Sequence, residues 1–482
     1  MSDHPSRRFA QRWLISGLCL NLCIAACGGD DSARTDVHGP TKRDASTDSD
    51  ASKPDAGPDA SQPLVDGSMP LDSGLDATVD GNVGPGPGPG DQDGGDDNDG
   101  GPGSTEVCQV ASEQSELNQP IGDAFIDEGG FSITPAVTGF ALAYRTDKTC
   151  AAIGLLPISG SGKYGTPERL FDNCAAGLVQ DVSLLRAGEG FGLAWIDNTA
   201  LSRELQTTHL ASSLSTSDVP EATRLTNNND DEWKPVQATI NGTSYVAWIS
   251  ENASSKKRAI QLQVADGSSE ARTLVAADAG YNPTRLALAQ LGKTRGALAF
   301  VSENVNAGVW LLALDDNAAA AGSVVAMTRQ VSTGNTVDLA TREEDGGAII
   351  YSASVGDSRD VRFRRLDDEA NVLSEEVKVA AGTIQAQDAS LARLGGGYVV
   401  AFRTLPTAAQ PQSQVRLTFV TKEGNLQRDA AGRLISYLVA DAGVGGGRVS
   451  VRVSTDGQLL IGFLDAEAQA LRLFRKRLDC AL

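Results

Sequence analysis

Short apolar runs recur along the chain after residue 130, and each run contains an aromatic side chain. The seven aromatics lie at steps of 51, 53, 52, 51, 51 and 61 residues, at Tyr144, Trp195, Trp248, Phe300, Tyr351, Phe402 and Phe463. A glycine comes four to six residues before each of them, and the residue directly before is small in six of the seven copies. A fixed period near 50 residues is typical of propellers and other repeat arrays. The pattern therefore predicts seven copies of one structural unit.

The third copy shows most clearly what the unit contains. Residues 235–240 have the length of a short strand, and an Asn-Gly turn separates them from a second, apolar strand at 245–249. Residues 258–266 alternate apolar and polar side chains, as a half-buried strand does, and a fourth strand is expected at 270–275. Four strands in each of seven copies predict an all-β fold, a seven-bladed β-propeller that occupies residues 105–482.

The seventh copy ends without a fourth strand, so the ring needs one from elsewhere. Residues 121–127 precede the first inner strand in the way that fourth strands precede the others. We expect this N-terminal segment to complete the seventh blade and so to close the ring. The aromatics are expected at the interfaces between blades, because an aromatic beside a small residue lets large and small side chains interdigitate.

Charge is distributed unevenly along the chain. Residues 28–104 contain 17 Asp, no Glu and four basic residues, and they contribute −13 to the net charge of −21. This segment has no aromatic residue, so it cannot bury enough apolar surface to offset the entropy of ordering. We expect a disordered, acidic tether over residues 27–104. The remaining sequence has no basic stripe, and nucleic acid is therefore not an expected partner.

An apolar run near the N-terminus follows three arginines and is too short to cross a bilayer. It ends in Ile-Ala-Ala-Cys at Cys27, and here the sequence resembles the lipobox of bacterial lipoproteins. The resemblance implies that residues 1–26 are a signal peptide and that Cys27 carries lipid. It also implies a lipid-anchored protein of the bacterial cell envelope, on the periplasmic face or at the cell surface. Ordinary cleavage without lipid and an uncleaved anchor are the alternatives.

Cysteine usage agrees with export from the cytoplasm. Besides Cys27 and two cysteines in the signal peptide, four remain, which is an even number in an oxidising compartment. Cys150 and Cys174 are equidistant from the turn around residue 162, and antiparallel partners equidistant from a turn lie side by side. We therefore expect them to form a disulfide. Cys108 and Cys480 remain, and a disulfide between them would staple the closure of the ring.

One position of the predicted inner strands, which line the central channel, is mostly polar. It is Val137 in the first copy, and the polar residues that follow are the candidate channel residues Ser183, Gln237, Arg285, Asp338, Ser390 and Ser450. Arg285 and Asp338 are expected on adjacent blades, where they would pair. One hypothesis is a hydrated wall whose groups satisfy one another. The other is a small-ligand site at one mouth of the channel.

An acidic loop enters the third copy at residues 227–232 and gathers Asp230, Asp231 and Glu232 at an expected rim. With the Leu-Thr before it and the Pro after it, the stretch 224–235 is similar to periplasmic TolB-like propellers. The resemblance supports the propeller fold and implies protein partners, and it transfers no catalytic residue. The loop is interpreted as a solvated turn, with a contact to a cation or a partner as the alternative.

Histidine is scarce, since His209 is the only one in the predicted propeller. This composition disfavours metal sites and catalytic triads that need several histidines. We find no nucleophile, zinc or phosphate-loop motif, and we expect no metal and no cofactor. The preferred function is a monomeric, non-catalytic propeller that binds a protein or a glycan. The alternative is a carbohydrate-active enzyme, as in sialidase-like propellers, with Arg285, Asp338 and Arg448 converging at one channel mouth.

Overall fold

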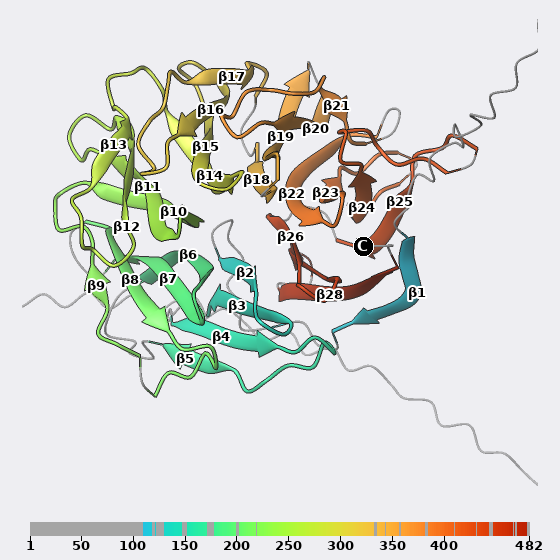
Figure 1. Ribbon diagram of the computed structural model, residues 1–482, viewed down its shortest axis with the longest axis horizontal. Coiled ribbons are helices and arrows are strands. Elements are labelled where there is room, and N and C mark those ends of the chain that lie inside the picture. The colour runs from blue at the N-terminus through green and yellow to red at the C-terminus, as the bar shows by residue number, and fades with distance from the viewer. Residues whose placement is uncertain are drawn as a thin grey trace, which may run out of the picture. The chain divides into compact units, whose positions relative to one another are not determined.

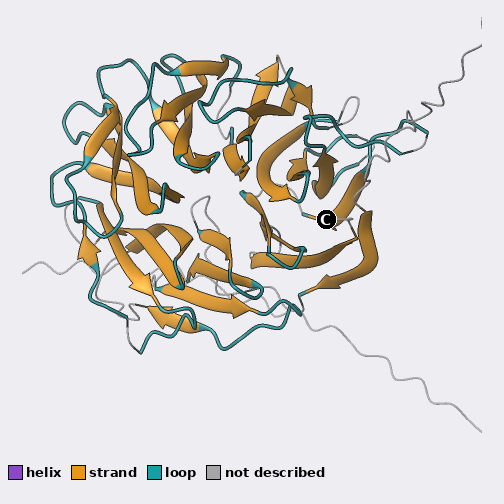
Figure 2. Cartoon of the chain, in the orientation of Figure 1, coloured by secondary structure: helices purple, strands orange, loops and turns teal. Residues whose placement is uncertain are grey.

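Four-stranded antiparallel sheets repeat seven times around a central channel (Figure 1). The computed structural model describes residues 109–117, 121, 130–146, 152–170, 178–198, 202–217, 219–331, 335–342, 344–355, 358–380, 384–408, 410–429, 431–442, 447–465, 467 and 470–479. Within these residues, Figure 2 shows strands joined by loops and turns. The sheets are the blades of a seven-bladed β-propeller, as the repeat predicts, and all of them belong to one unit, Asp97–Leu482.

Each blade runs from an inner strand at the channel to an outer strand at the rim. The first three blades consist of β2 (Phe131–Pro135), β3 (Phe140–Arg145), β4 (Ile153–Ile158) and β5 (Glu168–Leu170); β6 (Leu178–Ala187), β7 (Gly190–Asn198), β8 (Glu204–Leu210) and β9 (Thr223–Arg224); and β10 (Asp231–Ile240), β11 (Thr243–Glu251), β12 (Arg258–Val264) and β13 (Arg272–Val275). The next three consist of β14 (Pro283–Leu291), β15 (Arg295–Ser302), β16 (Gly308–Leu314) and β17 (Val325–Thr328); β18 (Val337–Arg342), β19 (Gly346–Val355), β20 (Ser358–Leu366) and β21 (Val377–Lys378); and β22 (Ala386–Leu394), β23 (Gly397–Thr404), β24 (Gln414–Val420) and β25 (Ser436–Asp441). The seventh combines β26 (Val449–Val453), β27 (Gln458–Asp465) and β28 (Ala470–Asp479) with β1 (Gln109–Glu116).

An N-terminal strand completes the seventh blade, as expected, but it is not the predicted strand. β1 pairs with β28, and Figure 1 shows the two strands side by side. Of the predicted strand 121–127, Ile121 makes a single bridge to Leu471, and residues 122–127 lie outside the described residues. Antiparallel partners run in opposite directions, and Ile121 sits opposite the start of β28. The rest of β28 must therefore pair with residues that precede Ile121.

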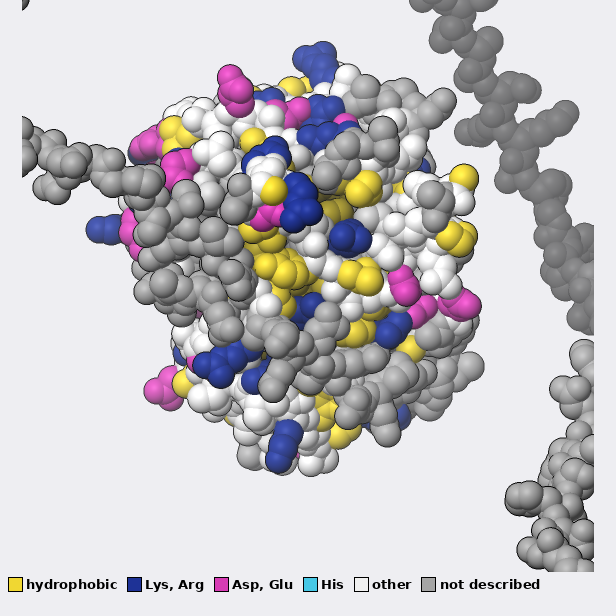
Figure 3. Space-filling view, turned by 90° about the vertical axis from the view of Figure 1, so that its right-hand side faces the viewer, with side chains coloured by type: hydrophobic (Ala, Val, Ile, Leu, Met, Phe, Trp, Pro, Cys, Tyr) yellow, Lys and Arg dark blue, Asp and Glu magenta, His cyan; other side chains and the backbone are white. Residues whose placement is uncertain are grey.

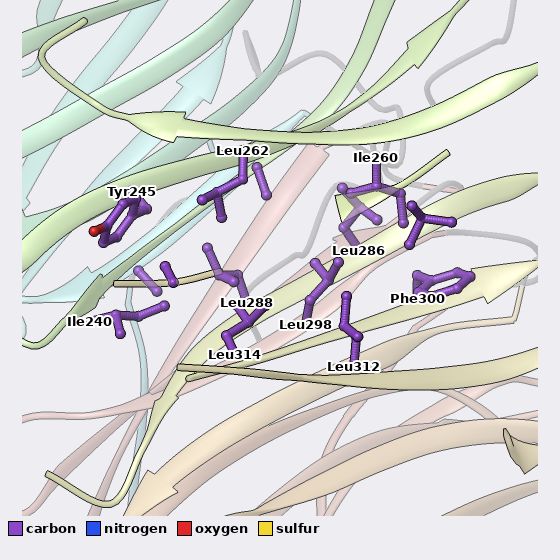
Figure 4. Close-up of a cluster of buried hydrophobic side chains, with 14 of the residues drawn as sticks. Ile240, Tyr245, Ile260, Leu262, Leu286, Leu288, Leu298, Phe300, Leu312 and Leu314 are labelled. Atoms are coloured by element: carbon purple, nitrogen blue, oxygen red, sulfur yellow. The ribbon is translucent and has the colours of Figure 1, made fainter. Parts of the chain in front are cut away.

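Every interface between neighbouring blades has its own cluster of buried hydrophobic side chains. Each cluster contains one of the seven repeat aromatics, and all seven aromatics are at most 3% exposed. Figure 4 shows the cluster between the third and fourth blades, where Phe300 lies together with Ile260 and Leu262 of the preceding blade. The prediction that the aromatics mark the blade interfaces is confirmed.

The outside of the propeller carries charges of both signs. On the side shown in Figure 3, Lys and Arg side chains are interspersed with Asp and Glu side chains. Among the described residues, no helix has the length and apolarity needed to cross a membrane.

Several predicted features lie outside the described residues. They are the signal peptide 1–26, Cys27, the tether up to residue 104, and the cysteines Cys108, Cys150, Cys174 and Cys480. The described strand pairs nearest to these four cysteines join Gln109 to Asp479 and Ile153 to Leu170. Lipidation, the tether and the two disulfides therefore stay predictions.

Candidate functional site

The central channel contains a cavity of about 550 Å³. It is lined by the inner strands of all seven blades, β2, β6, β10, β14, β18, β22 and β26, and by residues just before them. Pockets of about 300–1,000 Å³ are typical of small-molecule sites. Because every blade repeats the same strand order, the inner strands run in the same direction, and their N-terminal ends meet at one mouth of the channel.

Part of the predicted polar column forms hydrogen bonds between neighbouring blades. Asp338 Oδ2 accepts from the Ser390 hydroxyl at 2.7 Å and from the Leu391 N–H at 3.1 Å. Ser390 Oγ accepts in turn from the Val451 N–H at 3.1 Å. Asp338 forms an ion pair with Arg452 of the seventh blade, at 3.5 Å. The expected pair of Asp338 with Arg285 stays a prediction. These groups hold the fifth, sixth and seventh blades together, as the wall hypothesis expects.

Three other predicted channel residues also belong to the wall. Gln237 Nε2 donates to the carbonyl oxygen of Ser183 at 2.8 Å, which connects the third blade to the second. Ser450 is buried and lies outside the lining of the cavity. Arg285 also lines the cavity.

The strand pairing shows which residues of the predicted polar column occupy equivalent positions in the seven blades and which do not. The true column lies opposite the residue before each aromatic and consists of Ser132, Ser183, Val236, Ala287, Asp338, Ser390 and Ser450. Val137 is 59% exposed in the turn after β2, and Ser132 holds the position expected for it. Gln237 lies one residue after the true column, and Arg285 lies two residues before it. The strand pairing decides which residue faces the channel, and a hydrophobic pattern does not show that pairing.

A second column, two residues before the true column, is charged in five of the seven blades. Its members are Gly130, Asp181, Lys234, Arg285, Thr336, Asp388 and Arg448. The five charged members line the cavity, and we call them the charged ring. Because each lies near the start of its inner strand, the charged ring surrounds one mouth of the channel.

Three members of the charged ring have a left-handed backbone conformation. The φ angle is 43° at Asp181, 51° at Lys234 and 50° at Asp388. Each of the three lies where the pairing of its inner strand shifts register. A bulge redirects a side chain, and a non-glycine residue at positive φ costs about 1–3 kcal/mol. The same strained geometry in three blades indicates that the direction of these side chains is under constraint.

The carboxylates of the charged ring are held by cations. Asp181 Oδ1 lies 2.7 Å from Lys234 Nζ, and Asp181 Oδ2 accepts the Lys234 N–H at 3.2 Å. Asp388 Oδ2 lies 3.4 Å from Nη1 of Arg403, a side chain that is 1% exposed. Burial raises the pKa of Asp388, and the charges of Arg403 and two further arginines oppose the rise.

Arg448 has a different environment from the other members of the charged ring. Its Nη1 donates to the carbonyl oxygen of Phe131 at 3.3 Å, and its guanidinium carbon lies 5.9 Å from the centre of the Phe131 ring. Within the part of the chain that the structure describes, no carboxylate lies at ion-pair distance from Arg448. Enclosure by the channel wall, and then the charge of Arg452, lower the pKa of Arg448 to about 10. The charge of Arg448 is therefore poorly compensated in the described structure.

The three predicted rim carboxylates have different surroundings. Asp230 is half-buried, and its Oδ1 accepts from Asn252 Nδ2 at 3.0 Å. Asp231 and Glu232 belong to β10, which begins four residues earlier than predicted because both pair with β11. Asp231 is half-buried and Glu232 is 1% exposed. The expected loop of three solvated carboxylates is therefore divided between the surface and the interior.

Glu232 lies in a buried polar cluster close to Glu204 of the second blade. Its Oε1 accepts from Asn228 Nδ2 at 3.2 Å and from Ser250 Oγ at 3.3 Å. Glu232 Oε2 and the indole nitrogen of the neighbouring Trp248 have no hydrogen-bond partner among the described residues. Burial raises the pKa of Glu232 to about 7, although its hydrogen bonds oppose the rise. Glu232 therefore changes charge near neutral pH.

The sequence prediction of the site missed Asp181, Lys234 and Asp388. They lie at bulges, which add a residue to the strand, so they belong to a different position of the repeat from the predicted polar column. One signal was present in the sequence: two residues before the true column, five of seven copies carry a charge. That repeated charge is unusual for strands that are otherwise apolar.

The chemistry available in the cavity is hydrogen bonding and charge. Guanidinium, ammonium, carboxylate, hydroxyl and amide groups line it, and they suit recognition of a polar molecule. Among the residues with a described position, no group of three or more His, Cys, Asp or Glu side chains is arranged to hold a metal ion.

Comparison with known proteins shows that the chain is similar to solved structures in its fold alone. No protein-family model and no curated protein sequence matches the chain. Among solved structures, an α-L-arabinanase of Penicillium chrysogenum complexed with arabinobiose is 11% identical, with a TM-score of 0.45, over 77% of this chain and 98% of its own. The Dos1 propeller is 11% identical, with a TM-score of 0.41, over 76% of this chain and 81% of its own. Trypanosoma rangeli sialidase in complex with sialic acid is 10% identical, with a TM-score of 0.39, over 72% of this chain and 59% of its own.

Proposed function

We propose that the protein is a ligand-binding propeller whose channel mouth holds a sugar unit of a glycan without reacting with it. The observation that carries the proposal is the cavity of about 550 Å³ with the charged ring at its mouth. A cavity of this size accommodates a small polar ligand but not a folded partner protein. Sugar hydroxyls need both donors and acceptors, and the lining supplies both. The geometry therefore favours a glycan over a protein at this site.

The carboxylates of the cavity favour binding over hydrolysis. Cleavage of a glycosidic bond requires two carboxyl groups that flank the bond and act on it directly. Asp181 and Asp338 are instead engaged by cations and by backbone N–H groups of the neighbouring blade. The alternative, a carbohydrate-active enzyme, rests on Asp388, because a buried carboxyl group with a raised pKa suits a general acid.

Sugar binding is expected to raise the melting temperature of the purified full-length chain in a panel of mono- and disaccharides. A ligand at about 100 times its Kd stabilises the folded state by about 2.7 kcal/mol. The measurement is thermal unfolding at several sugar concentrations, followed by chromatography of the same mixtures for products. Hydrolysis products would support the enzyme, and a panel without any shift would contradict the proposal.

We also propose that lipid on Cys27 anchors the protein in a bacterial cell envelope and that residues 27–104 hold the propeller away from the lipid surface. The lipobox-like sequence and the acidic, aromatic-free composition of the tether support this role. Cys27→Ala is expected to move the protein from the membrane fraction to the soluble fraction, as measured by fractionation of expressing cells. The matched variant Cys23→Ala, inside the signal peptide, should remain with the membranes. Membrane association of Cys27→Ala would refute lipid anchoring.

A further inference from the structure

The cavity has an excess of positive charge although the chain is acidic. Its lining contains three acidic side chains, Asp181, Asp338 and Asp388, and six cationic side chains, Arg186, Lys234, Arg285, Arg393, Arg448 and Arg452. The whole chain has a net charge of −21. A cationic cavity in an anionic protein attracts an anion by its local field.

We infer that the bound sugar carries a carboxylate, as a uronic acid does, and that Arg448 receives it; this inference rests on the proposed function. Among the described residues, no carboxylate lies within ion-pair distance of the Arg448 guanidinium. A half-buried cation in the channel wall gains from a counter-charge, and an anionic ligand would supply that counter-charge.

The contacts of Arg448 orient its guanidinium without using all of its donors. A guanidinium has five N–H donors, and the structure assigns one hydrogen bond, to the carbonyl oxygen of Phe131. The guanidinium carbon lies 5.9 Å from the centre of the Phe131 ring. Arg452, four residues further along, is already committed to Asp338 and to the Ser390 hydroxyl. Arg448 is therefore better placed than Arg452 for bidentate binding of a carboxylate.

The charge of the ring favours a carboxylate over a phosphate. Within the charged ring itself, the positive charges of Lys234, Arg285 and Arg448 exceed the negative charges of Asp181 and Asp388 by one. Arg403, which pairs with Asp388, is 1% exposed and lies outside the ring. A carboxylate carries one negative charge, whereas a phosphate monoester carries about −1.5 to −2 at pH 7. A carboxylate thus balances the ring without leaving excess negative charge in the cavity.

The test is calorimetric titration of the purified full-length chain with matched neutral and acidic sugars. The pairs are glucose with glucuronate, galactose with galacturonate and mannose with mannuronate, and glucose 6-phosphate serves as the phosphate arm. One charge-assisted pair predicts that an acidic sugar binds about 10- to 100-fold more tightly than its neutral partner. The difference should shrink as salt is added.

Arg448→Gln is expected to remove the preference for the acidic sugar over its neutral partner. Arg448→Lys keeps the charge but loses the planar fork, so it should retain part of the preference. The control is Arg433→Gln in the β24–β25 connection, where the side chain is 80% exposed, and it should bind as the wild type does. Without ligand, Arg448→Gln should melt at or above the wild-type temperature, because it removes a poorly compensated cation.

The outcomes separate the two proposals. Equal binding of neutral and acidic sugars would overturn the carboxylate and leave the sugar site intact. Tighter binding of glucose 6-phosphate would also overturn the carboxylate. Arg448→Gln with a lower melting temperature and an unchanged preference would make Arg448 a structural residue of the wall. If no sugar binds, both proposals fall.

Discussion

Phe300→Ala is expected to lower the free energy of unfolding by about 3–5 kcal/mol, which is the usual cost of emptying a large buried aromatic site. Phe300 is 0% exposed and lies in the hydrophobic cluster between the third and fourth blades (Figure 4). Tyr281 packs against it edge to face, with ring centres 5.4 Å apart. Chemical denaturation followed by tryptophan fluorescence measures the change.

Two further variants separate loss of packing from a general effect of substitution. Phe300→Leu keeps most of the buried volume and is expected to cost about 1.5 kcal/mol or less. Val137→Ala alters an exposed turn residue and should change stability by no more than about 0.5 kcal/mol. If Phe300→Ala cost as little as Val137→Ala, the repeat aromatics would not hold the blades together.

Glu232→Gln is expected to flatten the dependence of stability on pH between about pH 5 and pH 8. Burial raises the pKa of Glu232 from its usual value of 4.5 to about 7. Between about pH 5 and pH 7 the carboxyl group of Glu232 has released its proton in the unfolded chain and still holds it in the folded protein. The contribution of Glu232 to folding is therefore fully present below pH 4.5, and it is lost as the pH rises through 7.

The size of this effect follows from the shift in pKa. Each unit corresponds to about 1.4 kcal/mol, so ionisation of Glu232 removes at most about 3 kcal/mol of stability between pH 5 and pH 8. The glutamine variant cannot ionise and should lack this part of the slope. Denaturation midpoints at several pH values measure it, and Val137→Ala serves as the control with a wild-type profile. Equal slopes in wild type and Glu232→Gln would show that burial does not keep Glu232 protonated.

The number of blades was predictable because one packing requirement recurs in each repeat. An aromatic such as Trp248 must fill the space beside the preceding blade, and that need leaves a regular spacing in the sequence. The strand that closes the ring was not predictable in the same way. Residues 109–116 read Gln-Val-Ala-Ser-Glu-Gln-Ser-Glu and have little hydrophobic pattern, whereas residues 121–127 have more. The antiparallel register decides that residues 109–116, and not 121–127, pair along β28, and this register cannot be seen in the sequence.

The site was predictable only in outline. Alignment of the repeats placed Asp338 and Ser390 on the channel side. It could not show that each accepts a hydrogen bond from the next blade. The bulges at Asp181, Lys234 and Asp388 depend on left-handed backbone geometry, for which these residue types are not a reliable signal. Glu232 looked exposed because its neighbours are polar, and its burial depends on the adjacent second blade.

The most direct test of the channel as the binding site is a crystal structure of the protein soaked with the acidic sugar that binds best. The account predicts electron density for the sugar inside the ring of inner strands, with its carboxylate within hydrogen-bonding distance of the Arg448 guanidinium. Density for the sugar at the outer rim of the blades, with the channel unchanged, would contradict it.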